Sequence, residues 1–337
     1  MNKVSVIIPN FNRAAIIGET IENMLSQTLP PHEVIIVDDG STDDSIDVIR
    51  KYGNKVILIQ QENAGPGAAR NAGLKGATGE FIQFMDSDDL ASLNKLEVQS
   101  KTLVANNADI VLGPWLKAWI AHKVMKLEDV VLQQKAPPSK RSDLLWFLTD
   151  WSMVFQQCLV RRSMLEKVGT YREDIKYFED GDLFIRILLA GGKLVYEAQT
   201  LTFYRLNDFG KLTGEGQINI GRVHAQSTFY QDIINRAVTD TTLKDCINHP
   251  DFKLNVFKAF SDLKENNLLD NSDKYSELSR MAQKDGIKIK LNRFNKKAQA
   301  AISQKIRGHR WPNSYQAGGL SQYQKVLINE LGFNLIK

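Results

Sequence analysis

The stretch Phe81-Ile82-Gln83-Phe84-Met85-Asp86-Ser87-Asp88-Asp89 decides the fold, because an apolar run with strand character ends abruptly in three carboxylates. A strand of this kind would carry its carboxylates to the edge of a sheet. Clustered carboxylates repel one another, and a hard divalent cation is one way to offset that repulsion. The alternative is an Asx turn and a helix N-cap before a helix expected over residues 94–106.

Strand-like runs alternate with helix-like segments around this stretch. The runs occupy residues 4–8, 34–37, 56–59, 81–85 and 110–112. The alternation predicts an α/β fold with a mostly parallel sheet and helices on both of its faces.

The later part of the chain has a different pattern. We expect an irregular excursion of the same domain over residues 113–139, which ends at Ala136-Pro137-Pro138-Ser139. Helices are then expected at 141–149, 163–168 and 179–190, and strands at 155–161, 193–197 and 201–206. Beyond about residue 221, long periodic segments predict a mainly helical C-terminal region. We therefore expect one domain over residues 1–220 and a helical region over 221–337.

Composition limits the classes of protein and of partner. With 337 residues, 43% of them hydrophobic, and a net charge of only +4, the chain is predicted to be globular and not to bind nucleic acid. Cys158 and Cys246 lie far apart without a ligand pattern, so we expect neither a disulfide nor a zinc site. Because we find neither a signal peptide nor a run of about 20 apolar residues, we expect a cytoplasmic protein.

Basic residues accumulate between Lys284 and Arg310, where Asp285 is the only acid. A solvated helix face is one interpretation. The other is peripheral contact with an anionic membrane surface or a lipid phosphate.

Two further motifs could bind a ligand. Val37-Asp38-Asp39-Gly40-Ser41 places two acids at the carboxyl end of a strand, where open α/β sheets bind ligands, although the same residues could simply shape a turn. The segment 63–73 combines glycines with Arg70, which could pair with phosphate, although it could equally be a tightly packed helix. The first strand ends in Pro9-Asn10-Phe11-Asn12, so no dinucleotide fingerprint is present.

A fourth motif, Tyr177-Phe178-Glu179-Asp180-Gly181-Asp182-Leu183, begins the helix expected over residues 179–190. Asp180 shares a helix face with Leu183 and Ile187, so it lies at the inner rim of a helix packed on the core. The helix dipole favours an ionised carboxylate in the first turn, which suits a general base. Ordinary enrichment of acids at helix N-termini is the alternative.

In this order along the chain, the motifs resemble those of family 2 inverting glycosyltransferases with the GT-A fold. They are Val4 to Asn12, Val37 to Asp43, Asn63 to Gly73, Asp86-Ser87-Asp88-Asp89 and Glu179-Asp180. The resemblance covers residues 1 to about 210.

The resemblance implies a donor site. Pro9 would lie beside the nucleotide base, and Asn10 belongs to the same donor-binding set. Asp39 matches the acid that binds the uracil ring, with Asp38 in support. Arg70 falls in the segment that contacts the donor.

The resemblance also implies a metal and a catalytic base. Asp86 and Asp88 match the DxD pair, with Ser87 between them in the donor-binding set. Asp88 would bind Mn²⁺ or Mg²⁺ on the diphosphate, and Asp86 the ribose or the metal shell. Asp180 matches the catalytic base, and Glu179 would lie beside the acceptor.

Two departures from the family pattern affect these expectations. Many relatives carry Tyr-Arg-x-His after the last strand, and the histidine helps to bind the metal or the diphosphate. This chain has Tyr204-Arg205-Leu206-Asn207, so we do not expect a histidine ligand, although Asn207 could still hydrogen-bond phosphate. Processive members carry Gln/Arg-x-x-Arg-Trp and membrane helices. Arg307-Gly308-His309-Arg310-Trp311 fits the short pattern, but its distant context favours coincidence, and we do not expect a membrane polymerase.

The resemblance implies metal-dependent transfer, with inversion, of a sugar from a nucleotide-sugar donor of the UDP type. The expected acceptor is a hydroxyl of a glycan or glycolipid in surface polysaccharide or glycoconjugate synthesis. Polyprenyl-phosphate glycosyl transfer and a non-catalytic nucleotide-sugar-binding protein of the same fold are the alternatives. A sugar nucleotidyltransferase is disfavoured, because its glycine-rich phosphate loop is missing after the first strand.

Overall fold

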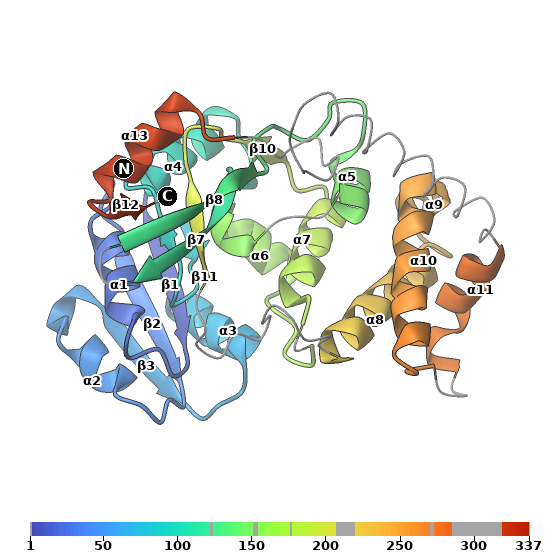
Figure 1. The fold of residues 1–337 in the computed structure, drawn as a ribbon, viewed down its shortest axis with the longest axis horizontal. Coiled ribbons are helices and arrows are strands. Elements are labelled where there is room, and N and C mark those ends of the chain that lie inside the picture. The colour runs from blue at the N-terminus through green and yellow to red at the C-terminus, as the bar shows by residue number, and fades with distance from the viewer. Residues whose placement is uncertain are drawn as a thin grey trace. The chain divides into compact units, whose positions relative to one another are not determined.

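The computed structural model describes residues 2–121, 124–150, 154–175, 177–206, 220–269, 273–284 and 319–336, and Figure 1 draws its ribbon. The chain forms two compact units. The α/β unit comprises residues 1–137, 152–209 and 316–337, and the helical unit comprises residues 138–151 and 210–315. A compact unit need not fold on its own, so the predicted domain boundary after residue 220 stays a prediction.

The first sheet of the α/β unit has seven strands in the order β10-β6-β9-β4-β1-β2-β3. The pairs β1–β2, β1–β4, β2–β3 and β6–β10 are parallel, and β9 runs antiparallel to β4 and β6. The predicted α/β fold with a mainly parallel sheet is therefore confirmed. The strands are β1 (Val4–Asn10), β2 (Glu33–Asp39), β3 (Ile57–Gln61), β4 (Phe81–Phe84), β6 (Ile110–Leu112), β9 (Cys158–Arg161) and β10 (Leu194–Tyr196).

Helices cover both faces of this sheet, which is why β1 is mainly apolar and buried along its whole length. On one face, Val6 and Ile8 pack in a core cluster with Ile21 and Leu103. On the other face, Ile7 lies against Gly73. The helices of the unit are α1 (Ile17–Leu25), α2 (Ser45–Arg50), α3 (Pro66–Gly76), α4 (Lys95–Ala105), α6 (Arg162–Val168) and α7 (Glu179–Leu189), with a 3-10 turn η1 (Gly53–Lys55).

A second, five-stranded sheet has the order β12-β8-β7-β11-β5. Its strands are β5 (Leu90–Ala91), β7 (Trp115–Ala121), β8 (Val124–Leu132), β11 (Thr202–Leu206) and β12 (Asn334–Ile336). The expectation of an irregular excursion over residues 113–139 was wrong, since β7 and β8 pair antiparallel within it. The reason is a period-two pattern: Leu116, Ala118 and Ile120 pack in the core of this sheet, whereas Trp119 on the other face is exposed.

The C-terminal residues complete the second sheet. Helix α13 (Gln322–Glu330) begins with a capping box at Ser321, and it buries Leu327 and Ile328 in the core of that sheet. Strand β12 then pairs parallel with β8. The C-terminal region is mainly helical, as expected, but its end belongs to the α/β unit.

The strand expected over residues 155–161 begins later than predicted. Phe155–Gln157 form a 3-10 turn (η2), and β9 follows from Cys158. The turn buries the side chains of Gln156 and Gln157, which a strand would direct to opposite faces.

The helical unit contains α5 (Asp143–Asp150), α8 (Ile220–Arg236), α9 (Thr241–Asn248), α10 (Pro250–Glu265), the 3-10 turn η3 (Asp273–Tyr275) and α11 (Ser276–Lys284). Arg141 joins α5 to α10 through ion pairs with Asp150 (2.8 Å) and Asp251 (3.2 Å). Asn255 on α10 donates to the carbonyl oxygens of Leu148 and Thr149. These contacts explain why α5 packs with helices that follow it by about a hundred residues.

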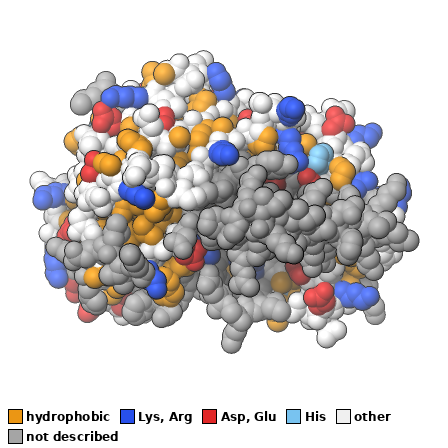
Figure 2. Space-filling model, turned by 45° about the horizontal axis from the view of Figure 1, so that its top comes forward, with side chains coloured by type: hydrophobic (Ala, Val, Ile, Leu, Met, Phe, Trp, Pro, Cys, Tyr) orange, Lys and Arg blue, Asp and Glu red, His pale blue; other side chains and the backbone are white. Residues whose placement is uncertain are grey.

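Within the described ranges, none of the helices combines the length and apolar character that a bilayer crossing needs. On the face drawn in Figure 2, Lys and Arg side chains lie scattered among acidic and apolar ones. Of the basic segment between Lys284 and Arg310, only Lys284 lies within the described residues, and Asn207 and the residues 307–311 lie outside them. Membrane contact through that segment stays a prediction.

Candidate functional site

The site is built at one edge of the first sheet. Strands β4, β1 and β2 are parallel neighbours, so their carboxyl ends lie side by side. Asn10 ends β1, Asp38 and Asp39 end β2, and Asp86 follows β4 after one residue. Pro9 is buried and lies opposite Val37 of β2.

Asp38 fastens the ends of β1 and β2 to each other. Its carboxylate accepts a hydrogen bond from Asn10 Nδ2 (2.8 Å) and one from the backbone N–H of Ser41 (3.0 Å). The Ser41 hydroxyl in turn accepts from the backbone N–H of Asn12 (2.9 Å). Asn10 Oδ1 is buried and accepts no hydrogen bond within the described residues, so it is available to a ligand at this edge.

Asp39 holds the loop that leads into α3. It accepts hydrogen bonds from Gln61 Nε2 (2.7 Å) and from the backbone N–H groups of Ala64 (2.9 Å) and Gly65 (2.8 Å). Gly65 has φ +94°, a left-handed conformation that glycine adopts without a steric penalty. The carboxylate at the end of β2 therefore sets where α3 starts, and hence where Arg70 lies.

Arg70 joins the sheet edge to α7. Its guanidinium lies 2.8 Å from Asp86 Oδ1, 3.1 Å from Glu179 Oε1 and 3.7 Å from Asp180 Oδ1, and only 5% of the side chain is exposed. It also lies over the ring of Tyr171, 5.1 Å from the centroid. Burial lowers the pKa of Arg70, but the acids around it outweigh this and raise the pKa well above its usual value, so the group stays charged. The structure thus brings Asp86, Glu179 and Asp180 into one ion network.

Asp180 is a carboxylic acid of this network with a raised pKa. Burial raises the pKa of Asp180 to about 7, with Arg70 lowering it and with Glu179 and Asp86 raising it. The Tyr171 hydroxyl donates to Asp180 Oδ1 (3.0 Å), which favours the ionised form. About 29% of the side chain is exposed, so a bound molecule could reach it. A partly exposed carboxylate with a pKa near neutrality can serve as a general base.

The backbone that presents Asp180 is strained. Phe178, directly before α7, has φ +65°, which non-glycine residues adopt at a cost of order 1 kcal/mol. Asn71 holds the loop that carries Tyr171, since its Nδ2 donates to Tyr171 O (2.9 Å) and its Oδ1 accepts from Tyr171 N (2.9 Å). Two neighbouring residues of α3 therefore act on Asp180: Arg70 contacts its carboxylate directly, and Asn71 holds the backbone of Tyr171, which donates to it.

The carboxylates of Asp86, Asp88 and Asp89 each offer an oxygen within 4.8 Å of the others. Carboxylate oxygens are suited to hard divalent cations such as Mg²⁺ and Mn²⁺. Asp88 Oδ2 lies 3.6 Å from Arg13 Nε, and Asp86 is partly exposed, with 31% of its side chain accessible. Asp89 is fully buried. Asp86 and Asp88 are therefore the two partly exposed acids of this cluster, and Ser87 between them is buried. That they bind a cation stays a prediction.

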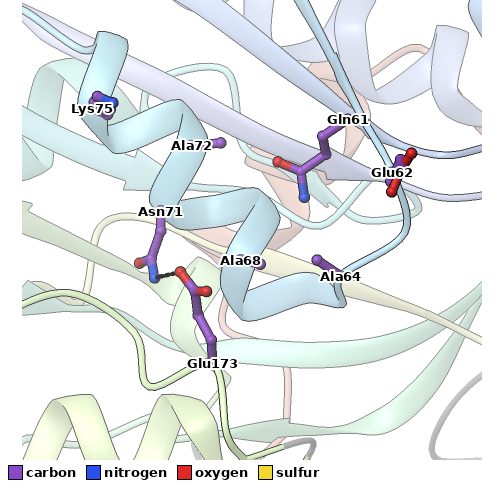
Figure 3. A pocket seen from close by; sticks show the side chains of 8 residues that line it. All are labelled: Gln61, Glu62, Ala64, Ala68, Asn71, Ala72, Lys75 and Glu173. Atoms are coloured by element: carbon purple, nitrogen blue, oxygen red, sulfur yellow. Dashed lines mark hydrogen bonds between the residues drawn. The ribbon is translucent and has the colours of Figure 1, made fainter.

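A pocket lies along α3 on the side of β3 (Figure 3). Its lining consists of Gln61, Glu62, Ala64, Ala68, Asn71, Ala72, Lys75 and Glu173. Gln61 is the residue that bonds Asp39, and Asn71 donates to Glu173 (2.8 Å) as well as to the loop of Tyr171. The pocket thus adjoins the residues that position Asp39 and Tyr171.

Several residues of the site were not predicted from the sequence: Tyr171, Gln156 and Arg13. Arg13 follows Asn12 in the first motif, which could have drawn attention to it. Tyr171 and Gln156 lie in segments without a motif, and only the fold brings them to Asp180 and Asp86. Arg205, part of the quoted Tyr204 to Asn207 segment, donates from Nε to Asp88 O (2.6 Å).

Comparison with known proteins confirms the resemblance. The family model described as Glycosyl transferase family 2 matches residues 5–169. An uncharacterized glycosyltransferase of Rickettsia typhi is 32% identical over 207 residues, which cover 61% of this chain and 64% of that protein. Another, of Rickettsia felis, is 47% identical over 107 residues, and the match spans only 18% of that relative's length. The Cholesterol galactosyltransferase of Borreliella burgdorferi is 39% identical over 127 residues, 37% of this chain and 36% of that protein.

Solved structures confirm the fold. S. aureus TarS 1–349 in complex with UDP-GlcNAc has a TM-score of 0.56 at 20% identity, and the match covers 78% of this chain and 82% of that one. The mannosyltransferase PcManGT from Pyrobaculum calidifontis, in complex with GDP-Man and Mn²⁺, has a TM-score of 0.51 at 18% identity and covers 91% and 88%. At these identities the likeness concerns the fold, which is the GT-A type.

Proposed function

Because residues 5–169 form a glycosyl transferase family 2 domain, we propose that this chain transfers a sugar from a nucleotide-sugar donor to an acceptor hydroxyl with inversion. The observation that carries the proposal is the Arg70 network. One buried guanidinium ties Asp86, at the edge expected to hold the donor, to Asp180 at the start of α7. A donor site and a general base therefore lie close enough to act on one reacting centre.

In the proposed reaction Asp180 takes the proton of the acceptor hydroxyl. The hydroxyl oxygen forms a bond to the anomeric carbon as the bond from that carbon to the diphosphate oxygen breaks, and the electron pair leaves with the nucleoside diphosphate. The attack comes from the face opposite the leaving group, so a single displacement inverts the anomeric centre without an enzyme nucleophile. The pKa of Asp180 near 7 lets it accept this proton at neutral pH.

Asp86 and Asp88 would hold Mn²⁺ or Mg²⁺, because they are the two partly exposed acids of the carboxylate cluster. A divalent cation bound there would neutralise charge on the leaving diphosphate. Arg70 supports the same step, as a fixed cation at the edge of the site. Asn10 and Asp39, at the ends of β1 and β2, would contact the base and ribose of the donor, with Pro9 and Asp38 in support.

We propose a UDP-sugar as the donor class, on the strength of Asp39 in the place that the family pattern gives to the uracil-binding acid. The likeness to a structure solved with UDP-GlcNAc agrees with this choice. The proposed acceptor is a glycan or glycolipid of surface polysaccharide or glycoconjugate synthesis.

The test is a panel of nucleotide sugars with Mn²⁺, scored by nucleotide release and by thermal stabilisation of the protein. A donor present at about 100 times its Kd should stabilise the fold by about 2.7 kcal/mol, and EDTA should remove most of this gain. Asp88→Ala should weaken the metal-dependent part of donor binding. If all donors leave the melting temperature unchanged, the proposal is wrong.

The role of Asp180 is tested in the same assay. Asp180→Asn should lower turnover by roughly 10²- to 10⁴-fold, because a general base contributes about that factor, while donor stabilisation persists. Full transfer activity in this variant would contradict the assignment. Loss of donor binding along with activity would instead indicate a structural role.

A further inference from the structure

Gln156 bridges two acids of the carboxylate cluster. Its Nε2 donates to Asp86 Oδ2 (3.1 Å) and also to Asp89 Oδ2, so both hydrogens of one amide group are used. The side chain is 3% exposed, and the 3-10 turn η2 holds its backbone. Hydrogen bonds to ionised acceptors are the stronger kind and orient the carboxylates that accept them.

The bridge from Gln156 helps to keep the Asp89 carboxylate inside the protein, away from solvent. Asp89 Oδ2 accepts from Gln156, and Asp89 Oδ1 accepts from the backbone N–H of Arg205 (2.8 Å). The backbone carbonyl of Asp89 accepts from the Thr20 hydroxyl (3.0 Å). With both carboxylate oxygens bonded inside the protein and no exposed surface, Asp89 is a structural acid.

The same bridge orients Asp86. Arg70 Nη2 bonds Oδ1 of Asp86, and Gln156 bonds Oδ2, so the plane of this carboxylate is set from two sides. Arg70 comes from α3 and Gln156 from η2, which are far apart in the chain. Two rigid donors on different elements hold a carboxylate in one orientation better than either alone.

A buried lysine lies behind the bridge. The backbone carbonyl of Gln156 accepts from Gln83 Nε2 (3.0 Å), and Gln83 Oε1 accepts from Lys95 Nζ (2.7 Å). Lys95 is fully buried, and its other acceptors are Gln99 Oε1 (2.5 Å) and Gln157 O (3.3 Å). Through these bonds the side chains of Gln83 on β4 and Lys95 on α4 hold the backbone carbonyls of η2.

We propose that Gln156 is a positioning residue for divalent cation binding by Asp86 and Asp88, an inference that rests on the proposed function. It orients Asp86 and keeps Asp89 turned inward, so that two acids rather than three present oxygens to the cation. Partners that orient metal ligands in this way typically change metal affinity by 10- to 100-fold when they are replaced.

The test compares Gln156→Leu and the milder Gln156→Asn with Gln157→Leu. Gln157 is the matched control: it is the neighbouring buried glutamine of the same turn, and its side-chain amide makes no hydrogen bond in the described part of the chain. Mn²⁺ binding is measured directly, by the electron paramagnetic resonance signal of the free ion, without donor. The part of UDP binding that persists in EDTA, followed by thermal shift at saturating UDP, reports whether the nucleotide end of the site is intact.

Both Gln156 variants should bind Mn²⁺ at least tenfold more weakly than wild type, with Gln157→Leu within about twofold and UDP binding in EDTA retained. If Gln156→Leu does not fold, Gln156→Asn decides, since its shorter side chain cannot span both acids. Unchanged Mn²⁺ affinity in the Gln156 variants overturns this inference alone. Failure of the wild type to bind Mn²⁺ overturns it together with the proposed cation site.

Discussion

Asp180 shows how a single residue acquires a chemical role from its surroundings. In the sequence it is one of three acids in the first turn of a helix, a common arrangement. In the structure, burial and the neighbouring acids raise its pKa to about 7, while Arg70 and the Tyr171 hydroxyl act in the opposite direction. The balance leaves a carboxylate that is ionised near neutral pH and still basic enough to accept a proton.

This balance predicts the pH dependence of the reaction. A base works only when ionised, so kcat/KM should rise with pH, about tenfold per unit, up to about pH 7 and then level off. A bound divalent cation would lower the pKa of Asp180 and move the rise in kcat/KM, the acid limb of the profile, to lower pH. A profile that shows no loss of kcat/KM on the acid side, with the divalent cation present, would contradict the role of Asp180.

Tyr171→Phe tests the contribution of the hydroxyl. Because the Tyr171 hydrogen bond lowers the pKa of Asp180, its removal should move the acid limb of the kcat/KM profile to higher pH, by roughly half to one unit. Tyr52→Phe makes the same chemical change directly before η1, where the hydroxyl donates to Gly18 O, and should leave the profile unchanged. Equal shifts in both variants would argue against a specific effect of Tyr171.

At the scale of elements, the decisive contact is that of α3 with the first sheet. Gly73 lets the helix approach the strands closely: a Cβ atom there would lie 2.4 Å from Ile7 Cγ2 and 3.2 Å from Val37 Cγ2. Asp39 fixes the start of the helix and Gly73 fixes its distance from the sheet. Together they place Arg70 between Asp86 and the start of α7.

Gly73→Ala should therefore lower the free energy of unfolding by about 1–3 kcal/mol, because the added methyl group overpacks the interface. Gly76→Ala is the matched control in the same helix, since its Cβ would meet Ile59 Cδ1 at an ordinary 3.8 Å. We expect this variant to be unchanged or slightly more stable, as alanine favours helix. Urea unfolding of both variants measures the difference, and equal stabilities would refute the close-approach argument.

At the scale of the whole molecule, the last residues of the chain complete the α/β unit. Strand β12 adds to the second sheet, and α13 covers the core of that sheet with Leu327 and Ile328. Strand β11 of the same sheet carries Arg205, whose backbone N–H bonds Asp89. The C-terminal segment therefore supports, through the second sheet, the strand that holds the carboxylate cluster.

Ile328→Ala tests this support. The side chain is fully buried, so its truncation should destabilise the α/β unit by about 2–5 kcal/mol. Val326→Ala on the same helix removes a side chain that is 52% exposed and should change stability by less than about 0.5 kcal/mol. Thermal unfolding, followed by tryptophan fluorescence, measures the stability of both variants. An Ile328→Ala variant as stable as the wild type would show that α13 does not stabilise the sheet.

The fold class, the order of the motifs and the resemblance to a family were determined by the sequence alone, because strand periodicity and residues at strand ends are local signals. Asp86, Asp88 and Asp180 could be nominated for the same reason. Only the tertiary structure shows that β7 pairs with β8, and that α13 and β12 pack in the second sheet. It also shows the contacts that those acids make with Gln156, Arg70 and Tyr171. These contacts join residues far apart in the chain, and their stability depends on packing and burial that a local pattern does not contain.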